Sequence, residues 1–167
     1  MSYFIRMPTL KISLDRTDHA ILTELSKNAR VSNKNLAILI GLSESRTSER
    51  LRSLRQSGII RGYHADIDPT ALGIGIEAMV AIRLRSHTRE AVVAFRAHAL
   101  SLRETMAVYH VAGQNDFVIH VAVRDASHLR DFALDAFTTR PEVSHLETTL
   151  IFEAIRKGVM PDWEAGE

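Results

Sequence analysis

The sequence of 167 residues predicts an α+β fold in two domains, an N-terminal winged helix-turn-helix domain and a C-terminal ferredoxin-like βαββαβ domain. Three observations support this prediction. Positive charge is concentrated in the first 65 residues, and two short helical segments there are separated by a turn that contains glycine. The second half alternates β-type and helical periodicity in the order β-α-β-β-α-β.

The charge is distributed unevenly along the chain. Residues 1–65 hold 11 Lys and Arg against 5 Asp and Glu, a net charge of +6, whereas residues 66–167 hold 10 against 15, a net charge of −5. The overall net charge of +1 hides this asymmetry. A basic half fits a polyanionic partner such as double-stranded DNA, although two halves of any chain also differ by chance.

The composition excludes several classes of protein. Apolar residues make up 46% of the chain, which predicts a packed core. The absence of cysteine excludes disulfides and thiolate chemistry. No apolar segment approaches the roughly 20 residues of a membrane span, and the first ten residues lack the pattern of a secretion signal. We therefore expect a cytoplasmic protein that makes no contact with a membrane.

Three helices are predicted in the basic half. Asp15, Ser32 and Ser43 are candidate N-caps, while Gly41 and Gly58 end the second and third helices. The first helix ends near residue 28. Because residues 41–43 form a tight turn, the second and third helices have the spacing of a helix-turn-helix. The side chains predicted to face inward are Ile21, Leu22 and Leu25, then Leu36, Ala37, Leu39 and Ile40, then Thr47, Leu51 and Leu54.

The outward face of the third helix carries hydroxyl and cationic side chains. Short hydroxyls allow close approach to DNA, and arginines contact phosphates or the edge of guanine. Ser45, Arg46 and Glu49 are the candidates for base reading; Arg50, Arg52 and Arg55 are candidate phosphate contacts or intramolecular partners. The predicted DNA-binding residues are Lys34, Ser43, Ser45, Arg46, Ser48, Glu49, Arg50, Arg52 and Arg61. The alternative is a solvated helix in which Glu49 pairs with a neighbouring arginine.

The segment that follows the third helix, residues 59–65, has extended character and predicts a small wing strand with Arg61 near the DNA backbone. Asp68 and Pro69 then mark a boundary, because proline disfavours helix at the residue before it.

The acidic half contains six predicted elements. The strands cover residues 76–85, 106–112, 117–123 and 143–152, and the helices cover 90–100 and 126–137. One face of the first strand carries Ile76, Ala78, Val80, Ile82 and Leu84. The side chains predicted to face inward from the helices are Val92, Val93, Phe95, Ala99 and Leu100, then Leu129, Phe132, Ala133 and Phe137.

Two helices on one face of a four-stranded sheet leave the other face, with Met79 and Ala81, in need of cover. A second subunit would provide it, so we expect an obligate homodimer. A dimer also suits DNA, because two recognition helices then address two half-sites.

Short motifs, in order and spacing, resemble the Lrp/AsnC (feast/famine) family over about residues 14–157. Gly41, Leu42 and Ser43, followed by Gly58, resemble the family's DNA-binding unit. Gly113 resembles the start of its glycine-x-x-aspartate-aromatic turn. Other matching positions are Leu14, Asp15, Asp18, Ile21, Leu22, Leu36, Ala37, Arg50, Leu54, Ile59, Ile60, Gly62, Tyr63, Asp68, Pro69, Leu72, Gly73, Asp116, Phe117, Pro141, Val143 and Thr148. The sequence departs from the family pattern at Thr47, Arg55 and Glu142, and residues 1–12 are an added arm or tail.

This resemblance implies a transcription regulator that binds DNA and senses an amino acid or related metabolite. It implies a DNA-binding domain with its extension over residues 1–65, a linker over 66–75, an effector-binding and oligomerisation domain over 76–157, and a tail over 158–167. It also implies dimers that assemble into tetramers or octamers. The effector candidates are Gly113, Gln114, Asn115, Asp116 and Thr148.

The turn at residues 113–116 is chemically suited to an amino acid. Gly113 allows unusual backbone angles, exposed amides bind a carboxylate, and Asn115 or Asp116 receives an ammonium group. The alternative is a turn that binds nothing, in which Asp116 fixes its own backbone.

No pattern of catalytic or metal-binding residues accompanies these features, so we expect no enzyme activity, cofactor or metal. The eight histidines include no i, i+4 pair on a predicted helix. We expect His110 to pair opposite Ile119, which places the rings of His110 and His120 on opposite faces of the sheet. Two rival functions stay open: an enzyme on the same scaffold that resembles siroheme decarboxylases, and an architectural DNA-binding protein without an effector.

Overall fold

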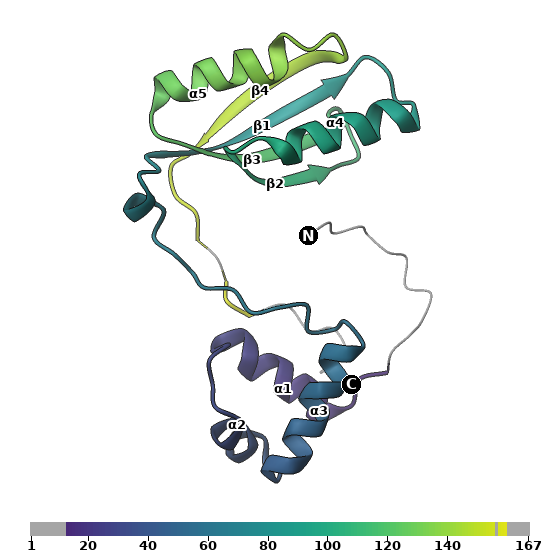
Figure 1. Cartoon of the computed structure of the whole chain (residues 1–167), viewed down its shortest axis with the longest axis vertical. Coiled ribbons are helices and arrows are strands. Elements are labelled where there is room, and N and C mark those ends of the chain that lie inside the picture. The colour runs from purple at the N-terminus through teal and green to yellow at the C-terminus, as the bar shows by residue number, and fades with distance from the viewer. Residues whose placement is uncertain (1–12, 156, 160–167) are drawn as a thin grey trace. The chain divides into compact units, whose positions relative to one another are not determined.

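The computed structural model describes residues 13–155 and 157–159, so the predicted arm at residues 1–12 and most of the tail lie outside the described residues. The chain divides into two compact units (Figure 1). The first holds the described residues up to Ala65 together with residues 157–159, and the second runs over Asp66–Ile155.

The first unit contains the three predicted helices, α1 (Arg16–Lys27), α2 (Asn33–Ile40) and α3 (Glu44–Gln56). The side chains of Asp15, Ser32 and Ser43 each accept a hydrogen bond from the backbone N–H three residues later, as predicted for N-caps. Gly41 ends α2 with φ of 69°, a left-handed conformation that glycine adopts without strain.

The core of this unit forms where the three helices meet. Ile21, Leu36, Leu51 and Leu54 are buried together, and the buried hydroxyl of Thr47 donates to the carbonyl of Ser43 at 3.0 Å. The prediction was wrong for Leu39, which is 61% exposed. In a helix of only two turns, Leu36, Ala37 and Ile40 occupy the face that meets the core, and Leu39 lies outside it.

The predicted wing strand does not form within this chain. Ile59 and Ile60 pack against the helical core, and the Ile60 N–H donates to the Leu54 carbonyl at 3.0 Å. Residues 61–68 follow without regular secondary structure and belong to no strand. A strand needs a hydrogen-bonded neighbour, and the described part of the first unit contains none.

The second unit has the predicted βαββαβ order after a 3₁₀ turn, η1 (Pro69–Leu72). The elements are β1 (Ile76–Leu84), α4 (Arg89–Ser101), β2 (Thr105–His110), β3 (Phe117–Val123), α5 (Ala126–Ala133) and β4 (Val143–Ile151). The strands form one antiparallel sheet in the order β2-β3-β1-β4, the ferredoxin-like arrangement (Figure 1).

Helices α4 and α5 pack on one face of this sheet, since Phe95 and Phe132 share a single core with Val80 and Ile82 of β1. The rings of Phe95 and Phe117 lie with their centroids 4.9 Å apart at its centre. The predicted second helix is shorter than expected: α5 ends at Ala133, and a π-helical turn, η2 (Leu134–Thr138), carries Phe137 into the core.

Val93 and Leu100 of α4 are exposed, contrary to prediction, at 45% and 54%. The sheet meets only a narrow stripe of α4, formed by Val92, Phe95 and Ala99, so apolar residues at its margin stay outside.

The hairpin between β2 and β3 differs from the predicted register. His110 lies opposite Phe117 rather than Ile119, because Val111 hydrogen-bonds to Asp116 and the loop is residues 112–115. The observed partner of His110 is two residues from the predicted one. Because side chains alternate between the faces of a sheet with a period of two, the imidazoles of His110 and His120 still lie on opposite faces, as predicted. His110 stacks on Phe117 with ring centroids 4.9 Å apart, and His120 lies on the face that carries Met79.

Candidate nucleic-acid interface and ligand domain

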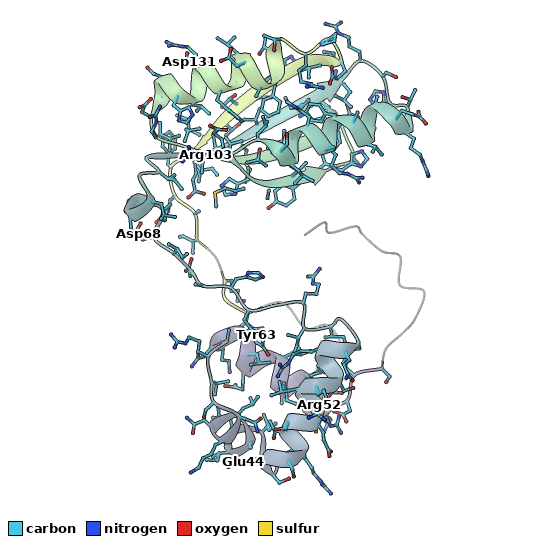
Figure 2. The ribbon with its side chains drawn as sticks, viewed as in Figure 1. Glu44, Arg52, Tyr63, Asp68, Arg103 and Asp131 are labelled. Carbon is cyan, nitrogen blue, oxygen red and sulfur yellow. The ribbon has the colours of Figure 1, made fainter. Side chains whose placement is uncertain are left out.

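Helix α3 places apolar side chains toward the core and cationic side chains toward solvent. Thr47, Leu51 and Leu54 face inward, and the positions between them point outward because a helix turns every 3.6 residues. The exposed residues on this outward face include Ser45, Arg46, Glu49, Arg52 and Arg55. Figure 2 labels Glu44 in the first turn of α3 and Arg52 further along the helix.

All three predicted DNA-binding hydroxyls have partners within the protein, since the hydroxyl of exposed Ser45 lies 3.3 Å from that of Ser43. Ser43 caps α3 by accepting from the Arg46 N–H at 3.4 Å. Ser48 is half-buried, and its hydroxyl receives a hydrogen bond from the Asn33 side chain at 2.8 Å. Ser43 and Ser48 therefore contribute to the shape of the helix-turn-helix.

Arg50 also bonds within the unit. Its Nη1 contacts Oδ2 of Asp15 and lies 3.0 Å from Oδ1 of Asp18, both at the start of α1. The Asp18 backbone N–H and then the Arg50 guanidinium lower the pKa of Asp15 below its ordinary value, and the same carboxylates raise the pKa of Arg50. Of the two roles predicted for Arg50, the geometry supports the intramolecular one.

The remaining predicted DNA-binding residues lie outside α3. Lys34 is exposed in the first turn of α2, and Arg61 is exposed in the irregular segment after α3. Sequence reasoning missed Asn33, whose amide nitrogen donates to the Glu44 carbonyl at 3.0 Å as well as to Ser48. These contacts span 11 and 15 residues across the turn, so no local pattern identifies them.

In the second unit, the turn at residues 113–116 is fixed to the end of β1. Gly113 has φ of 127°, which disfavours any side chain. The Gln114 carbonyl accepts from Nε of Arg83 at 2.6 Å. Asp116 accepts from the Leu84 N–H at 2.8 Å through one carboxylate oxygen, and the other lies 2.9 Å from Nε2 of His87. Asp116 therefore ties the turn to the end of β1 through Leu84, rather than to its own backbone as the alternative interpretation expected.

Thr148 is exposed on β4, opposite Val80 of β1. Asp116 bonds to Ile82 and Leu84, further along β1, and β3 pairs with the other edge of that strand. The structure of one chain therefore does not bring Thr148 to the turn with which it was grouped.

Comparison with known proteins decides the family. Residues 14–61 match a model described as a winged helix-turn-helix that binds DNA, and residues 77–160 match the Lrp/AsnC ligand binding domain. The transcriptional regulator AldR of Mycolicibacterium smegmatis is 40% identical over 143 residues, which cover 86% of this chain and 84% of AldR. The chain belongs to the Lrp/AsnC family.

Solved structures agree with this assignment to the Lrp/AsnC family. A transcriptional regulator from Neisseria meningitidis in complex with L-methionine has a TM-score of 0.83 at 26% identity, covering 89% of this chain and 97% of that one. AsnC of Escherichia coli has a TM-score of 0.77 at 27% identity, with 87% and 97% covered. The α+β fold class predicted from the sequence is thereby confirmed.

This Lrp/AsnC protein is thus a DNA-binding transcriptional regulator with a ligand-binding domain. Within the described residues, no three histidine, aspartate or glutamate side chains come together as a metal site. None of the helices in those residues has the length and apolar character that crossing a membrane requires.

Proposed function

We propose that this regulator recognises specific DNA sequences with the outward face of α3, and that an amino acid or a related small metabolite alters its DNA binding. The observation that carries the DNA part is the exposure of Ser45, Arg46 and Glu49 at the N-terminal end of α3. The same helix is held in place by buried residues on its other side. A recognition helix needs both properties, a fixed position and a free reading surface.

The roles divide along the helix. Ser45, Arg46 and Glu49 contact base edges, because the N-terminal part of a recognition helix enters the groove. Arg52 contacts the phosphate backbone, with Lys34 and Arg61 outside α3 as further phosphate contacts. Phosphate contacts add affinity and salt dependence, whereas base contacts add sequence preference.

A binding site for the test comes from repeated selection of a random duplex pool on the full-length protein. Fluorescence anisotropy then gives Kd for the selected duplex and for a scrambled one. We expect Arg46→Ala to weaken binding to the selected duplex by about 1–3 kcal/mol and to reduce the preference for it over the scrambled duplex. We expect Arg52→Ala to weaken binding to both duplexes and to reduce the slope of log affinity against log salt concentration by about one. Arg130→Ala, an exposed arginine of α5, is the matched control. Unchanged binding by both Arg46→Ala and Arg52→Ala would refute the assignment.

The effector part of the proposal rests on the ligand-binding domain and on the turn at residues 113–116. The Neisseria regulator was solved with L-methionine, which supports an amino acid as the class of ligand. Because both oxygens of Asp116 already have partners, we assign it to holding the turn. The backbone around Gly113 then binds the carboxylate of the effector, with Gln114 and Asn115 as further contacts at the turn. Because one chain does not bring Thr148 to this turn, Thr148 stays a candidate contact only where a second copy of the chain supplies it.

Thermal unfolding in the presence of each of the twenty amino acids tests this assignment. A true effector raises Tm because it binds the folded protein, and the rise continues with the logarithm of its concentration above Kd. Gly113→Ala removes that rise, because alanine disfavours φ of 127°. Gly158→Ala, at a glycine without positive φ, keeps it. No stabilisation by any of the twenty would favour an architectural DNA-binding protein instead.

We further propose that the protein works as a homodimer or a larger homo-oligomer and acts by binding rather than catalysis. Met79 and Ala81 are only half-buried on the sheet face away from the helices, which leaves apolar surface for a second copy. A charge placed on this face by Met79→Glu should separate the copies, so that sedimentation velocity shows monomers. Val93→Glu, at an exposed position of α4, should leave the assembly intact. A wild-type monomer at micromolar concentration would contradict this.

A further inference from the structure

Arg50 lies on α3 between Arg46 and Arg52, but its side chain has a different environment from theirs. Arg46 and Arg52 are exposed, and in the described part of the chain neither forms an ion pair. The Arg50 guanidinium contacts carboxylates of α1 that lie 35 and 32 residues earlier in the sequence. It is the arginine that joins the third helix to the first.

The contact uses the oxygens that the helix cap leaves free. Oδ1 of Asp15 accepts from the Asp18 N–H at 2.9 Å, and Oδ2 of Asp18 accepts from the Asp15 N–H at 3.2 Å. The second oxygen of each carboxylate receives Arg50. One guanidinium therefore completes a cap that already fixes the first turn of α1, and the Asp18 side chain is only 14% exposed.

The charge of this group does not suit a phosphate contact. Two carboxylates and one guanidinium sum to −1, so a DNA phosphate brought to Arg50 would meet the negative charge of Asp15 and Asp18. Both hydrogen bonds are charge-assisted and use Nη1, which ties this end of the guanidinium to the start of α1.

We infer that Arg50 is a positioning residue, which fixes the orientation of α3 against the cap of α1 so that Arg46 and its neighbours read DNA, and that Asp15 and Asp18 act as its partners in this role. This inference rests on the proposed function of α3. It removes Arg50 from the DNA contacts predicted from sequence and gives the start of α1 a part in sequence preference.

The test compares Arg50→Gln with the double variant Asp15→Asn/Asp18→Asn, using the selected and scrambled duplexes described above. Asparagine side chains still accept the hydrogen bonds of the cap, so the double variant keeps α1 while it loses the ion pairs. Lys27→Gln, which breaks the exposed pair with Glu24 in the same unit, is the control for a lost positive charge. Circular dichroism verifies the fold of each variant.

The expected result is a fall in the ratio of the two affinities, on the order of tenfold, in both variants. Combining all three substitutions should lower the ratio of the two affinities no further than either variant does alone, because each variant already removes the contact between Arg50 and the two carboxylates. If Arg50 contacts phosphate instead, Arg50→Gln weakens binding to both duplexes equally. The double variant then binds both duplexes more tightly, with the ratio of the two affinities unchanged.

Either the phosphate-contact pattern or an unchanged ratio in both variants would overturn the inference. Arg46→Ala, measured in parallel, separates this from failure of the proposed function. If Arg46→Ala loses affinity while the Arg50 variants keep their preference, only the role of Arg50 is wrong. If Arg46→Ala has no effect, the reading surface itself is wrong.

Discussion

The Nε2 atom of His120 lies 2.6 Å from Oε2 of Glu77 on the sheet face that carries Met79 and Ala81. The residue His120 is only 7% exposed, so its imidazole is a buried polar group that depends on this one carboxylate. The pair connects neighbouring strands β1 and β3 on the side away from α4 and α5. It therefore contributes to the sheet from the face that we assign to a second copy of the chain.

Glu77→Ala should destabilise the second unit. The substitution leaves the buried imidazole without its partner, which costs about 1–3 kcal/mol. Urea unfolding at fixed protein concentration, followed by circular dichroism, measures the change. Glu153→Ala, at an exposed position after β4, is the control. An unfolding midpoint equal to that of the wild type would indicate that water satisfies His120 without Glu77.

Two leucines of the first unit test the core that positions α3. Leu54 is 4% exposed and Leu39 is 61% exposed, although the sequence pattern assigned both to the interior. Leu54→Ala should cost about 2–5 kcal/mol, because it removes buried methyl groups and leaves a cavity. Leu39→Ala should change the free energy of unfolding by no more than about 0.5 kcal/mol. Equal effects of the two substitutions would show that α2 packs differently.

Asp15 makes the stability of the first unit depend on pH in the acidic range. Because the Asp18 N–H and Arg50 favour its charged form, the pKa of Asp15 in the folded protein lies below the ordinary value of 3.8. The stabilisation is fully present above that value and disappears as the pH falls through the lowered folded pKa. The stability difference between wild type and Asp15→Asn should therefore shrink toward zero on acidification. Urea unfolding of both proteins at a series of pH values measures it, and a constant difference would contradict the assignment.

The features that the sequence predicted best depend on contacts between near neighbours. Asp15, Ser32 and Ser43 each cap a helix through a hydrogen bond three residues away, so a short window contains both partners. The alternation along β1 likewise reports one buried face. For this reason the order of the elements, and with it the fold class, follows from local patterns.

The features that the sequence predicted poorly depend on distant partners. Leu39, Val93 and Leu100 are apolar at helical spacing, but whether they are buried is decided by how wide a face the neighbouring elements cover. The partners of Arg50 are more than 30 residues away, and those of Asn33 lie across the turn. The exposed face of α3 was predictable from periodicity, whereas the interactions that occupy Arg50 and Ser48 were not.

The most direct test of the central claim, that the outward face of α3 lies on DNA, uses the absence of cysteine from the sequence. A single cysteine introduced by Ser45→Cys is labelled with an iron chelate that cleaves DNA within its reach, and Ser127→Cys on α5 serves as the control. We predict cleavage inside the selected site from position 45 and none from position 127. Cleavage from position 127, with none from position 45, would contradict the account.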